Sequence, residues 1–538
     1  MLRILLQQVR RDRLNLPIWI LGTVLLLAAS ANSVLAEYGD AEGRAQILQV
    51  ALATPALLAL RGIPNGDSIG SAVHFQSFAF LAVTIGLMNT FLATRHGRAD
   101  EEHGRRELVL ASPVSRLSPP LATLVLGVIA DGVFVALAVA GYRSAGLDAG
   151  GALVSATALG VTGLAFLGVG MVAGELTPTS RAANGVGAVV VLGAYALRAA
   201  GDALGTPDIA RQTLAPAWPS WISPIGWGQQ TLAFTDDNWW PVAWIGALAA
   251  AAVTIALVVH ARRELGASLL PERDGRPDGG PLLGSPIGLA WRLQVPTLLA
   301  WTGGSALLGL ALGSLVTAIA NADIDNPAVE AILESLGHTQ GDLARALIPA
   351  LMVLVGVLAA AAGVQAVLRL REEEVAGRTE EVLAGPRSRP GWLLAFTAVG
   401  ALSVLVVLVV LVVLVATGVT SAVGFAVIGN SDDAWLALGQ AVVQAPAALT
   451  LVGAAALLVG VVPRAAIALG WGMFAAGVGL GLFGDLLGLP DGVIDISPIS
   501  NVPGLPTDDW VPTIVLGVIA LGLAAFAALA FRRRDLVT

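Results

Sequence analysis

Long apolar runs separated by short polar segments recur along the whole chain. A bilayer core of about 30 Å takes roughly 20 helical residues to cross, and twelve runs come near that length. The pattern therefore predicts an all-α polytopic membrane protein with about twelve transmembrane helices. The predicted spans are residues 17–36, 76–94, 118–142, 151–174, 183–200, 241–261, 296–319, 346–368, 391–420, 435–461, 466–484 and 511–531.

The first apolar run imitates a cleavable signal peptide, because arginines precede it and the small-residue stretch Ser33-Val-Leu-Ala36 ends it. We interpret it as a retained span. The sequence Arg13-Leu-Asn-Leu-Pro17 opens the first half just as Arg292-Leu-Gln-Val-Pro296 opens the second, where no signal peptide can stand.

The residues before the first span fit an amphipathic helix that lies on the membrane surface. A plain positively charged flank is the alternative. The apolar positions at helical spacing are Leu2, Leu5, Leu6 and Val9.

The second half of the chain repeats the first. Residues 101–116 read EEHGRRELVLASPVSR and residues 374–389 read EVAGRTEEVLAGPRSR, and at an offset of 273 ten of the sixteen positions are identical. Further landmarks recur in the same order. They are Arg181-Ala-Ala with Arg464-Ala-Ala, Ser223-Pro-Ile with Ser497-Pro-Ile, and Arg262-Arg-Glu-Leu265 with Arg533-Arg-Asp-Leu536.

An even number of spans in each copy gives both copies the same orientation. We therefore expect two tandem six-helix repeats related by pseudo-two-fold symmetry along the membrane normal. Residues 1–265 are assigned to the first six-helix domain and residues 291–538 to the second. Residues 266–290, rich in proline and glycine, are the predicted cytoplasmic linker.

The amino-acid composition excludes several classes of protein and of chemical site. Charged residues make up 13% of the chain, against about 25% in soluble domains, so a soluble protein is excluded. The chain has neither lysine nor cysteine. Without lysine it cannot form the phosphate-binding loop G-x-x-x-x-G-K-[ST], so ATP hydrolysis would need another chain. Without cysteine, disulfides and thiolate metal sites are excluded.

The arginines are distributed unevenly between the two sides of the membrane. With the N-terminus inside, 24 of the 30 basic residues lie in inside segments. Because cytoplasmic loops carry the excess of positive charge, both termini are predicted to be cytoplasmic. The six arginines on the outside are Arg44, Arg61, Arg143, Arg198, Arg211 and Arg345.

The repeated segment between the second and third spans of each half is the main functional candidate. Its acidic cluster, glycine, arginine, glutamate and apolar pair predict a short helix, which proline ends before the next span. An apolar edge beside charge fits a groove of a soluble partner. A plain positively charged loop is the alternative, but it leaves the shared spacing unexplained. The candidate docking residues are Glu101, Gly104, Arg105, Glu107, Pro113 and Arg116 in the first copy and Glu374, Gly377, Arg378, Glu380, Pro386 and Arg389 in the second.

The shared pattern E-x-x-G-R-x-E-x-V-L-A-x-P-x-S-R resembles the coupling-helix region of type-2 ABC exporter permeases. The two copies, the Ser-Pro-Ile before each last span and the ending Phe531-Arg-Arg-Arg-Asp-Leu536 are similar to actinobacterial permeases of the polyketide-antibiotic, tetronasin-exporter type. This resemblance covers essentially the whole chain. It implies two fused six-span domains that work with two copies of a separately encoded ABC ATPase, which would hold ATP and Mg.

The resemblance also implies that residues 201–240 and 485–510 form short re-entrant or external helices capping the exit path. The tryptophans of these segments equally fit an interfacial aromatic belt. They are Trp218, Trp221, Trp227, Trp239, Trp240 and Trp510.

We therefore expect the permease subunit of an ABC-type exporter in a bacterial plasma membrane. Because the spans are apolar and hold few charges, the expected cargo is a hydrophobic or amphipathic small molecule, such as an antibiotic or drug, and the expected consequence is multidrug resistance. The expected partners are the ATPase and membrane lipids. No enzymatic site, cofactor, metal or nucleic acid is expected on this chain.

A proton-coupled secondary transporter of the major facilitator class is the main alternative, since it is also six plus six with parallel repeats. Its G-x-x-x-D-[RK]-x-G-R-[RK] signature matches the glycines and final arginines of residues 97–106. Glu101 and Glu102 stand where an aspartate and a basic residue are required, however. A membrane-embedded enzyme has little support, because the five histidines show no metal-ligand spacing.

Asp131 is the one carboxylate predicted in the middle of a span, a position that is costly for a charge and therefore a functional candidate. Its counterpart at the repeat offset is Val404. We favour a structural hydrogen bond to a neighbouring helix over a role in transport. Gln365, Gln440 and Gln444 have the same two interpretations.

Overall fold

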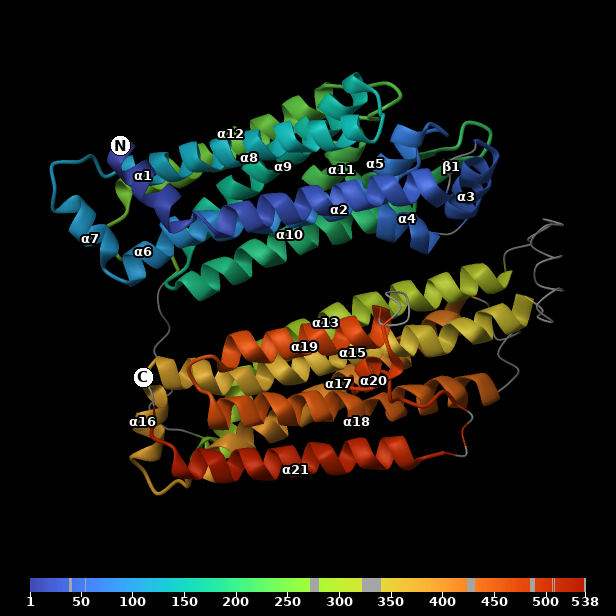
Figure 1. Cartoon of the computed structure of the whole chain (residues 1–538). Helices are drawn as coiled ribbons and strands as arrows, with labels where there is room; N and C mark the ends of the chain where they lie inside the picture. Colours follow the sequence, from blue (N-terminus) through green and yellow to red (C-terminus); the bar gives the residue numbers. More distant parts are fainter. Residues whose placement is uncertain are drawn as a thin grey trace. The chain divides into compact units, whose positions relative to one another are not determined.

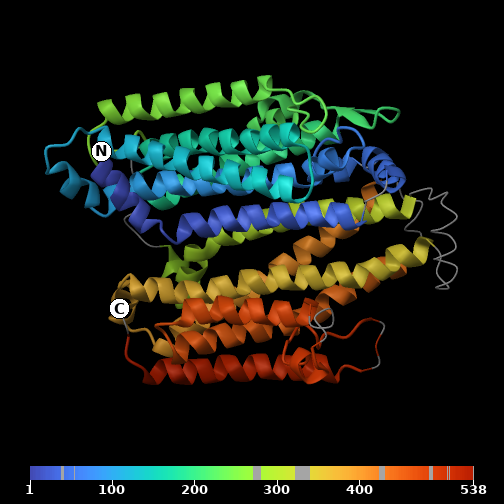
Figure 2. The same ribbon diagram turned by 45° about the horizontal axis from the view of Figure 1, so that its top comes forward.

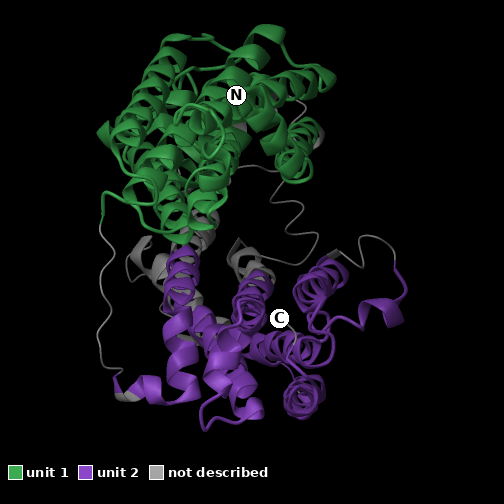
Figure 3. Cartoon of the chain, turned by 90° about the vertical axis from the view of Figure 1, so that its left-hand side faces the viewer, with its two compact units in different colours: residues 1–274 green, residues 275–538 purple. Residues whose placement is uncertain are grey.

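The structure is a computed structural model of the chain. It divides into two compact units, residues 1–274 (unit 1) and 275–538 (unit 2), shown in Figure 3. The structure describes residues 1–37, 41–53, 55–270, 280–321, 340–422, 431–483, 489–505, 507 and 509–536.

Unit 1 is a bundle of long helices with short elements at both ends (Figures 1 and 2). The N-terminus, α1, α6 and α7 gather at one end, and α3, α4 and the two strands gather at the other. Its elements are α1 (Leu2–Arg11), α2 (Asn15–Glu37), α3 (Ala41–Ala53), α4 (Pro55–Arg61), α5 (Ile69–His96), α6 (Arg98–Glu102), α7 (Arg105–Leu110), α8 (Ser118–Ser144), α9 (Ala149–Leu176), α10 (Ser180–Ala203), β1 (Thr206–Asp208), β2 (Thr213–Ala215), η1 (Trp218–Ile222), α11 (Pro224–Gln229) and α12 (Trp240–Arg262).

Helices α5 and α9 form the inside of unit 1 and pack against each other. Small residues allow this approach: a Cβ atom at Gly170 would lie 2.8 Å from the Cα atom of Thr90. Both helices begin at capping side chains, since Ser68 accepts a hydrogen bond from the Ser71 backbone and Asp148 accepts from the backbone of Gly151.

Unit 2 is a second bundle of long helices, with α16 at the same end as the C-terminus (Figure 1). Helix α15 packs against α17 and α18, and α18 packs against α21. Its elements are η2 (Pro281–Gly284), α13 (Pro286–Asn321), α15 (Gln340–Val375), α16 (Arg378–Leu383), α17 (Arg389–Ala422), α18 (Ser431–Val461), α19 (Ala466–Phe483), α20 (Asp491–Ile494) and α21 (Val511–Arg533).

Ten helices in the described part of the chain are long and apolar enough to cross a membrane. Each overlaps a predicted span, so the chain is an all-α polytopic membrane protein. The other two predicted spans, 296–319 and 466–484, fall on α13 and α19. The apolar stretch of α19, Ala466–Leu482, is shorter than those ten, and residue 484 lies outside the described residues. The total of twelve stays a prediction. The ten helices are Asn15–Leu35, Ile69–Glu102, Ser118–Ser144, Ala149–Leu176, Ser180–Ala203, Trp240–Arg262, Met352–Val375, Arg389–Val410, Gly439–Val461 and Val511–Arg533.

The segments before the last helix of each unit contain short elements. Residues 201–240 hold the antiparallel pair β1 and β2, the 3-10 helix η1 and α11, and residues 489–505 hold α20. Residues 484–488, 506 and 508 of the second segment lie outside the described residues, as do residues 271–279 of the predicted linker. The sequence analysis did not predict the strands, α3 or α4.

The two Ser-Pro-Ile landmarks have one geometry. The Ser223 hydroxyl donates to the Ala194 carbonyl at 2.7 Å and accepts from the Ile225 backbone at 3.2 Å. The Ser497 hydroxyl donates to the Gly477 carbonyl at 2.7 Å and accepts from the Ile499 backbone at 3.1 Å. Each serine therefore ties the segment before the last helix of its unit to the preceding long helix.

Candidate functional site

The repeated segment forms the predicted short helix in both units. In unit 1, α7 follows Gly104, and in unit 2, α16 follows Gly377. Both glycines have left-handed backbone, with φ of 68° and 76°, a conformation that other residues adopt at a cost. The two helices end at Leu110 and Leu383, before Pro113 and Pro386.

Glu101 is the centre of a buried ionic cluster in unit 1. Its carboxylate accepts hydrogen bonds from Arg106 at 2.6 Å and from Arg263 at 2.8 Å, and Arg98 lies 3.1 Å away. The four side chains are between 2% and 5% exposed. Because Arg263 is the residue after α12, the cluster attaches the α6–α7 segment to the last long helix of the unit.

Glu374 holds the same position in unit 2. Its two carboxylate oxygens accept from Arg534 at 2.5 and 2.7 Å, and Arg371 lies 3.1 Å away. Arg534 is the residue after α21, the last helix of unit 2. The segment is therefore braced to the last helix in both units, and we call the pairs Glu101–Arg263 and Glu374–Arg534 the two braces.

A second carboxylate supports each of the short helices α7 and α16 from its N-terminal side. Arg105 donates to Asp100 at 2.8 Å, and Arg378 donates to Glu373 at 2.5 Å. The hydrogen bond to Glu373 raises the pKa of Arg378 above its ordinary value.

Arg116 and Arg389, at the C-terminal end of the two repeated segments, bind the residue that follows the last long helix of their unit. Arg116 donates to the Arg263 carbonyl at 2.7 Å, and Arg389 donates to the Arg534 carbonyl at 2.8 Å. The bonded groups of Glu101, Arg105 and Arg116, and of their counterparts, thus hold the segment within its own unit.

Other predicted residues face outward. Glu107 and Glu380 are exposed, and their side chains have no hydrogen bond or ion pair with any described residue. Pro113 and Pro386 are also exposed. Leu108 beside Glu107 is 77% exposed, whereas its counterpart Glu381 is charged. The outward surface of each short helix therefore combines a glutamate with a neighbour that differs between the units.

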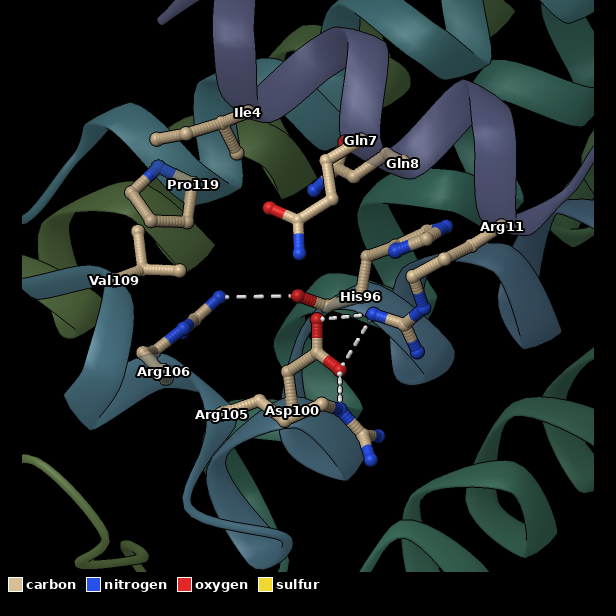
Figure 4. Close-up of a pocket in the computed structure, with 10 residues that line it drawn as sticks. All are labelled: Ile4, Gln7, Gln8, Arg11, His96, Asp100, Arg105, Arg106, Val109 and Pro119. Carbon is tan, nitrogen blue, oxygen red and sulfur yellow. Dashed lines mark hydrogen bonds and ion pairs between the residues drawn. The ribbon is translucent and has the colours of Figure 1, made fainter.

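A small pocket lies where α1, α6, α7 and α8 meet. Figure 4 shows Arg11 and Arg105 bonded to Asp100, and Arg106 pointing to the backbone carbonyl of His96. The enclosed space is about 30 Å³, room for roughly one or two water molecules. The pocket is therefore too small for a drug-like molecule.

Unit 1 has a further carboxylate at its brace. Glu175 of α9 accepts from Arg263 at 2.5 Å and lies 2.8 Å from the His260 ring. Burial alone would lower the pKa of Arg263, but its hydrogen bonds to Glu175 and Glu101 raise it. At the offsets of the neighbouring landmarks, Leu458 and Phe531 stand in the places of Glu175 and His260.

Sequence analysis missed the basic partners of the braces and missed Glu175. The signal for the partners was present, because Arg263 and Arg534 lie at matching positions in the repeated landmark after the last span. Glu175 and His260 have no repeat counterpart, so the duplication gave no sign of them.

Asp131 lies in the middle of α8 and is 2% exposed. One of its carboxylate oxygens accepts from the Asn89 amide of α5 at 2.9 Å, and the other has no partner among the described residues. At the repeat offset, unit 2 has Ala362 and Val404 in place of Asn89 and Asp131. The structure thus contains the hydrogen bond between neighbouring helices that we favoured.

The chain is similar to a known protein over nearly its whole length and to a protein family over its second half. It is 34% identical over 531 residues to the multidrug efflux system permease protein Rv1217c of Mycobacterium tuberculosis (strain ATCC 25618 / H37Rv), covering 98% of this chain and 93% of the relative. Residues 283–532 match the family described as the C-terminal domain of the multidrug efflux system permease Rv1217c.

Proposed function

Because this chain belongs to the family of multidrug efflux system permeases, we propose that it is the membrane-spanning subunit of an ABC-type exporter of the type-2 class. A separate ATPase, in two copies, would dock on α7 and α16 and hold ATP and Mg. The proposed cargo is a hydrophobic or amphipathic drug-like molecule.

The observation that carries this proposal is the pair of short helices braced to the last long helices. Each presents outward an exposed glutamate that has no hydrogen bond or ion pair with a described residue, and each is attached through a buried carboxylate to the end of α12 or α21. A plain loop needs no such attachment. The chain also lacks lysine, so the lysine of a phosphate-binding loop would have to come from a partner.

The proposed mechanism transmits motion through the braces. Closure of the ATPase pair on ATP would move α7 and α16, and the braces would carry this movement to α12 and α21. Twelve spans in two repeats, related by a pseudo-two-fold axis along the membrane normal, would then alternate between inward and outward access. Both termini and both short helices lie on the ATPase side in this proposal, the cytoplasmic face of a bacterial plasma membrane.

Co-expression with an ABC-type ATPase of the same genome, the neighbouring reading frame being tried first, tests the docking. The double variant Glu107→Arg with Glu380→Arg is expected to lose the co-purifying ATPase and the drug-stimulated ATP hydrolysis. Charge reversal acts directly here, because both glutamates are exposed and unpaired among the described residues.

Glu264 and Asp535 supply the matched control. They are exposed acidic residues that follow the arginines of the two braces, so their reversal to arginine changes the same charge on nearby positions. The control variant should keep the ATPase. Equal retention of the ATPase by both variants would refute docking on α7 and α16.

A further inference from the structure

Helix α1 has one face on the protein and one face free. On the protein side, the Gln8 amide donates to Thr123 of α8 at 3.0 Å, and Leu5 packs into an apolar cluster with residues of α5, α8 and α12. On the other side, Leu2, Leu6 and Val9 are 67%, 49% and 41% exposed. Their spacing places these three side chains along one edge of the helix.

The free apolar edge of α1 continues into a membrane-facing surface. Helix α2 begins four residues after α1 ends and is a candidate membrane span. Its exposed apolar residues continue the series from α1. They are Ile18, Leu21 and Leu25, and Leu14 in the connection just before α2 is also exposed. In a membrane, lipid covers this face of α2. The lipid therefore also reaches the free apolar edge of α1.

Arginines accompany the apolar edge of α1. Arg3, Arg10 and Arg13 are exposed and form no ion pair with any described residue. Arg3 and Arg10 lie two turns apart on one side of the helix. An apolar edge flanked by arginines fits a bilayer surface that carries anionic headgroups.

The protein side of α1 is bonded to the docking segment of unit 1. Arg11 donates to Asp100 at 2.8 and 2.9 Å, and Asp100 also accepts from Arg105 of α7 (Figure 4). The next residue, Asp12, is hydrogen-bonded to His96 and lies 3.1 Å from Arg95. A change in the position of α1 would therefore reach α7 through Asp100.

Unit 2 supports its docking helix differently. Glu373, the counterpart of Asp100, lies 2.8 Å from Arg369 of its own helix α15. The residues equivalent to α1 form the short η2 and the start of α13. Arg387, which follows α16, donates to the Leu283 and Gly284 carbonyls of η2 at 3.3 Å. Among the described residues of unit 2, no ion pair joins η2 or the start of α13 to α16.

We propose that α1 binds the anionic lipid headgroups of the membrane surface and that the Arg11–Asp100–Arg105 link makes the position of α7 depend on these lipids. The position of α16 does not depend on them. This proposal does not require the ATPase, so its test is separate from that of the proposed function.

The absence of cysteine makes the chain ready for single-site spin labelling. A label at Leu6→Cys is examined in nanodiscs of phosphatidylcholine alone and of a mixture rich in phosphatidylglycerol. In the anionic bilayer it should become several-fold more accessible to oxygen and less accessible to a water-soluble nickel chelate. A label that stays accessible to the water-soluble nickel chelate in both lipids would overturn the proposal.

Removing charge tests the role of the arginines. The triple variant R3Q/R10Q/R13Q should abolish the lipid dependence of the Leu6→Cys label. The control R262Q/R532Q/R533Q removes three exposed arginines from the ends of α12 and α21 and should keep it. If the control variant lost the lipid dependence to the same extent, recognition of the headgroups by the arginines of α1 would be overturned.

A label on the docking helix tests the link. Leu108→Cys should be less mobile in the anionic bilayer, whereas Glu381→Cys, at the equivalent position of α16, should not respond to lipid. Arg11→Gln should abolish the response at Leu108→Cys while Leu6→Cys remains in lipid. A response that survives Arg11→Gln, or an equal response at Glu381→Cys, would overturn the link through Asp100.

Discussion

The two braces share their central ion pair and differ in what surrounds it. In unit 1, Glu101 is bonded to Arg263, which also donates to Glu175, and Glu175 in turn contacts the His260 ring. In unit 2, Glu374 is bonded to Arg534, and Leu458 and Phe531 take the places of Glu175 and His260. The Arg534 guanidinium lies 4.5 Å from the centre of the Phe531 ring.

This difference shows which part of the arrangement the duplicated chain has retained. The carboxylate and the arginine at the end of the last helix are present in both units. The supporting pair differs at both positions: it is two hydrogen-bonded polar residues in unit 1 and two residues of one apolar cluster in unit 2. Buried polar groups are costly when only one partner is lost, which accounts for the joint replacement.

Loss of the brace carboxylate should have the largest effect, and a larger one in unit 1. Glu101→Gln leaves three arginines, each at most 5% exposed, without their shared anion. We expect a loss of about 3 to 5 kcal/mol in the free energy of unfolding. Glu374→Gln should cost about 1.5 to 3 kcal/mol, because Arg534 is 12% exposed and Thr379 stands in place of Arg106.

Unfolding of the purified chain in a detergent series, followed by tryptophan fluorescence, measures both losses. Glu264→Gln, an exposed acidic residue next to the first brace, is the control and should change little. A smaller loss for Glu101→Gln than for Glu374→Gln would contradict the comparison.

Replacing Glu175 and His260 of unit 1 by the types of residue that stand in their places in unit 2 should reveal strong energetic coupling between the two positions. Glu175→Leu alone should cost about 1 to 3 kcal/mol, because it leaves the His260 ring and an Arg263 nitrogen without their partner. The double variant Glu175→Leu with His260→Phe should recover at least about 1 kcal/mol of the summed single losses. The same unfolding measurement gives the free energies of the two single variants and the double variant. If the two single losses in the free energy of unfolding simply add up in the double variant, the two residues do not act as a pair.

The Asn89–Asp131 pair of unit 1 can likewise be replaced by the apolar residues that stand at the equivalent positions of unit 2. Asn89→Ala should cost about 1 to 3 kcal/mol, because it leaves a buried carboxylate without its hydrogen bond. Adding Asp131→Val reproduces the Ala362 and Val404 of unit 2 and should restore stability. Transport by this double variant should be close to normal. A stable double variant without transport would assign Asp131 a transport role instead.

The two Ser-Pro-Ile landmarks should give the smallest and most equal effects. Ser223→Ala and Ser497→Ala each remove a hydrogen bond to a carbonyl and a capping bond of the same geometry. We expect about 0.5 to 2 kcal/mol in each case. Unequal losses, seen as different shifts of the unfolding midpoint, would show that the segments before the last helix are held differently in the two units.

Sequence reasoning captured the features that depend on local periodicity. Apolar runs located the long helices, and the glycine and proline positions located α7 and α16. Glu101, Arg105 and Arg116 were assigned to a docking surface, which stays a prediction, and their bonds within the unit were not foreseen.

The brace partners could not be placed by periodicity. Glu101 and Arg263 lie 162 residues apart, and hydropathy carries no information about which helix ends meet. The strands β1 and β2 have three residues each, too few for an alternating pattern to stand out.

Drug transport into inside-out vesicles distinguishes an ATP-driven exporter from a proton-coupled carrier. Vesicles holding this chain and its ATPase are given a fluorescent amphipathic drug, with ATP or with an imposed proton gradient. The account predicts ATP-dependent accumulation that requires the ATPase and persists when a protonophore removes the gradient. Accumulation driven by the proton gradient with this chain alone would contradict it.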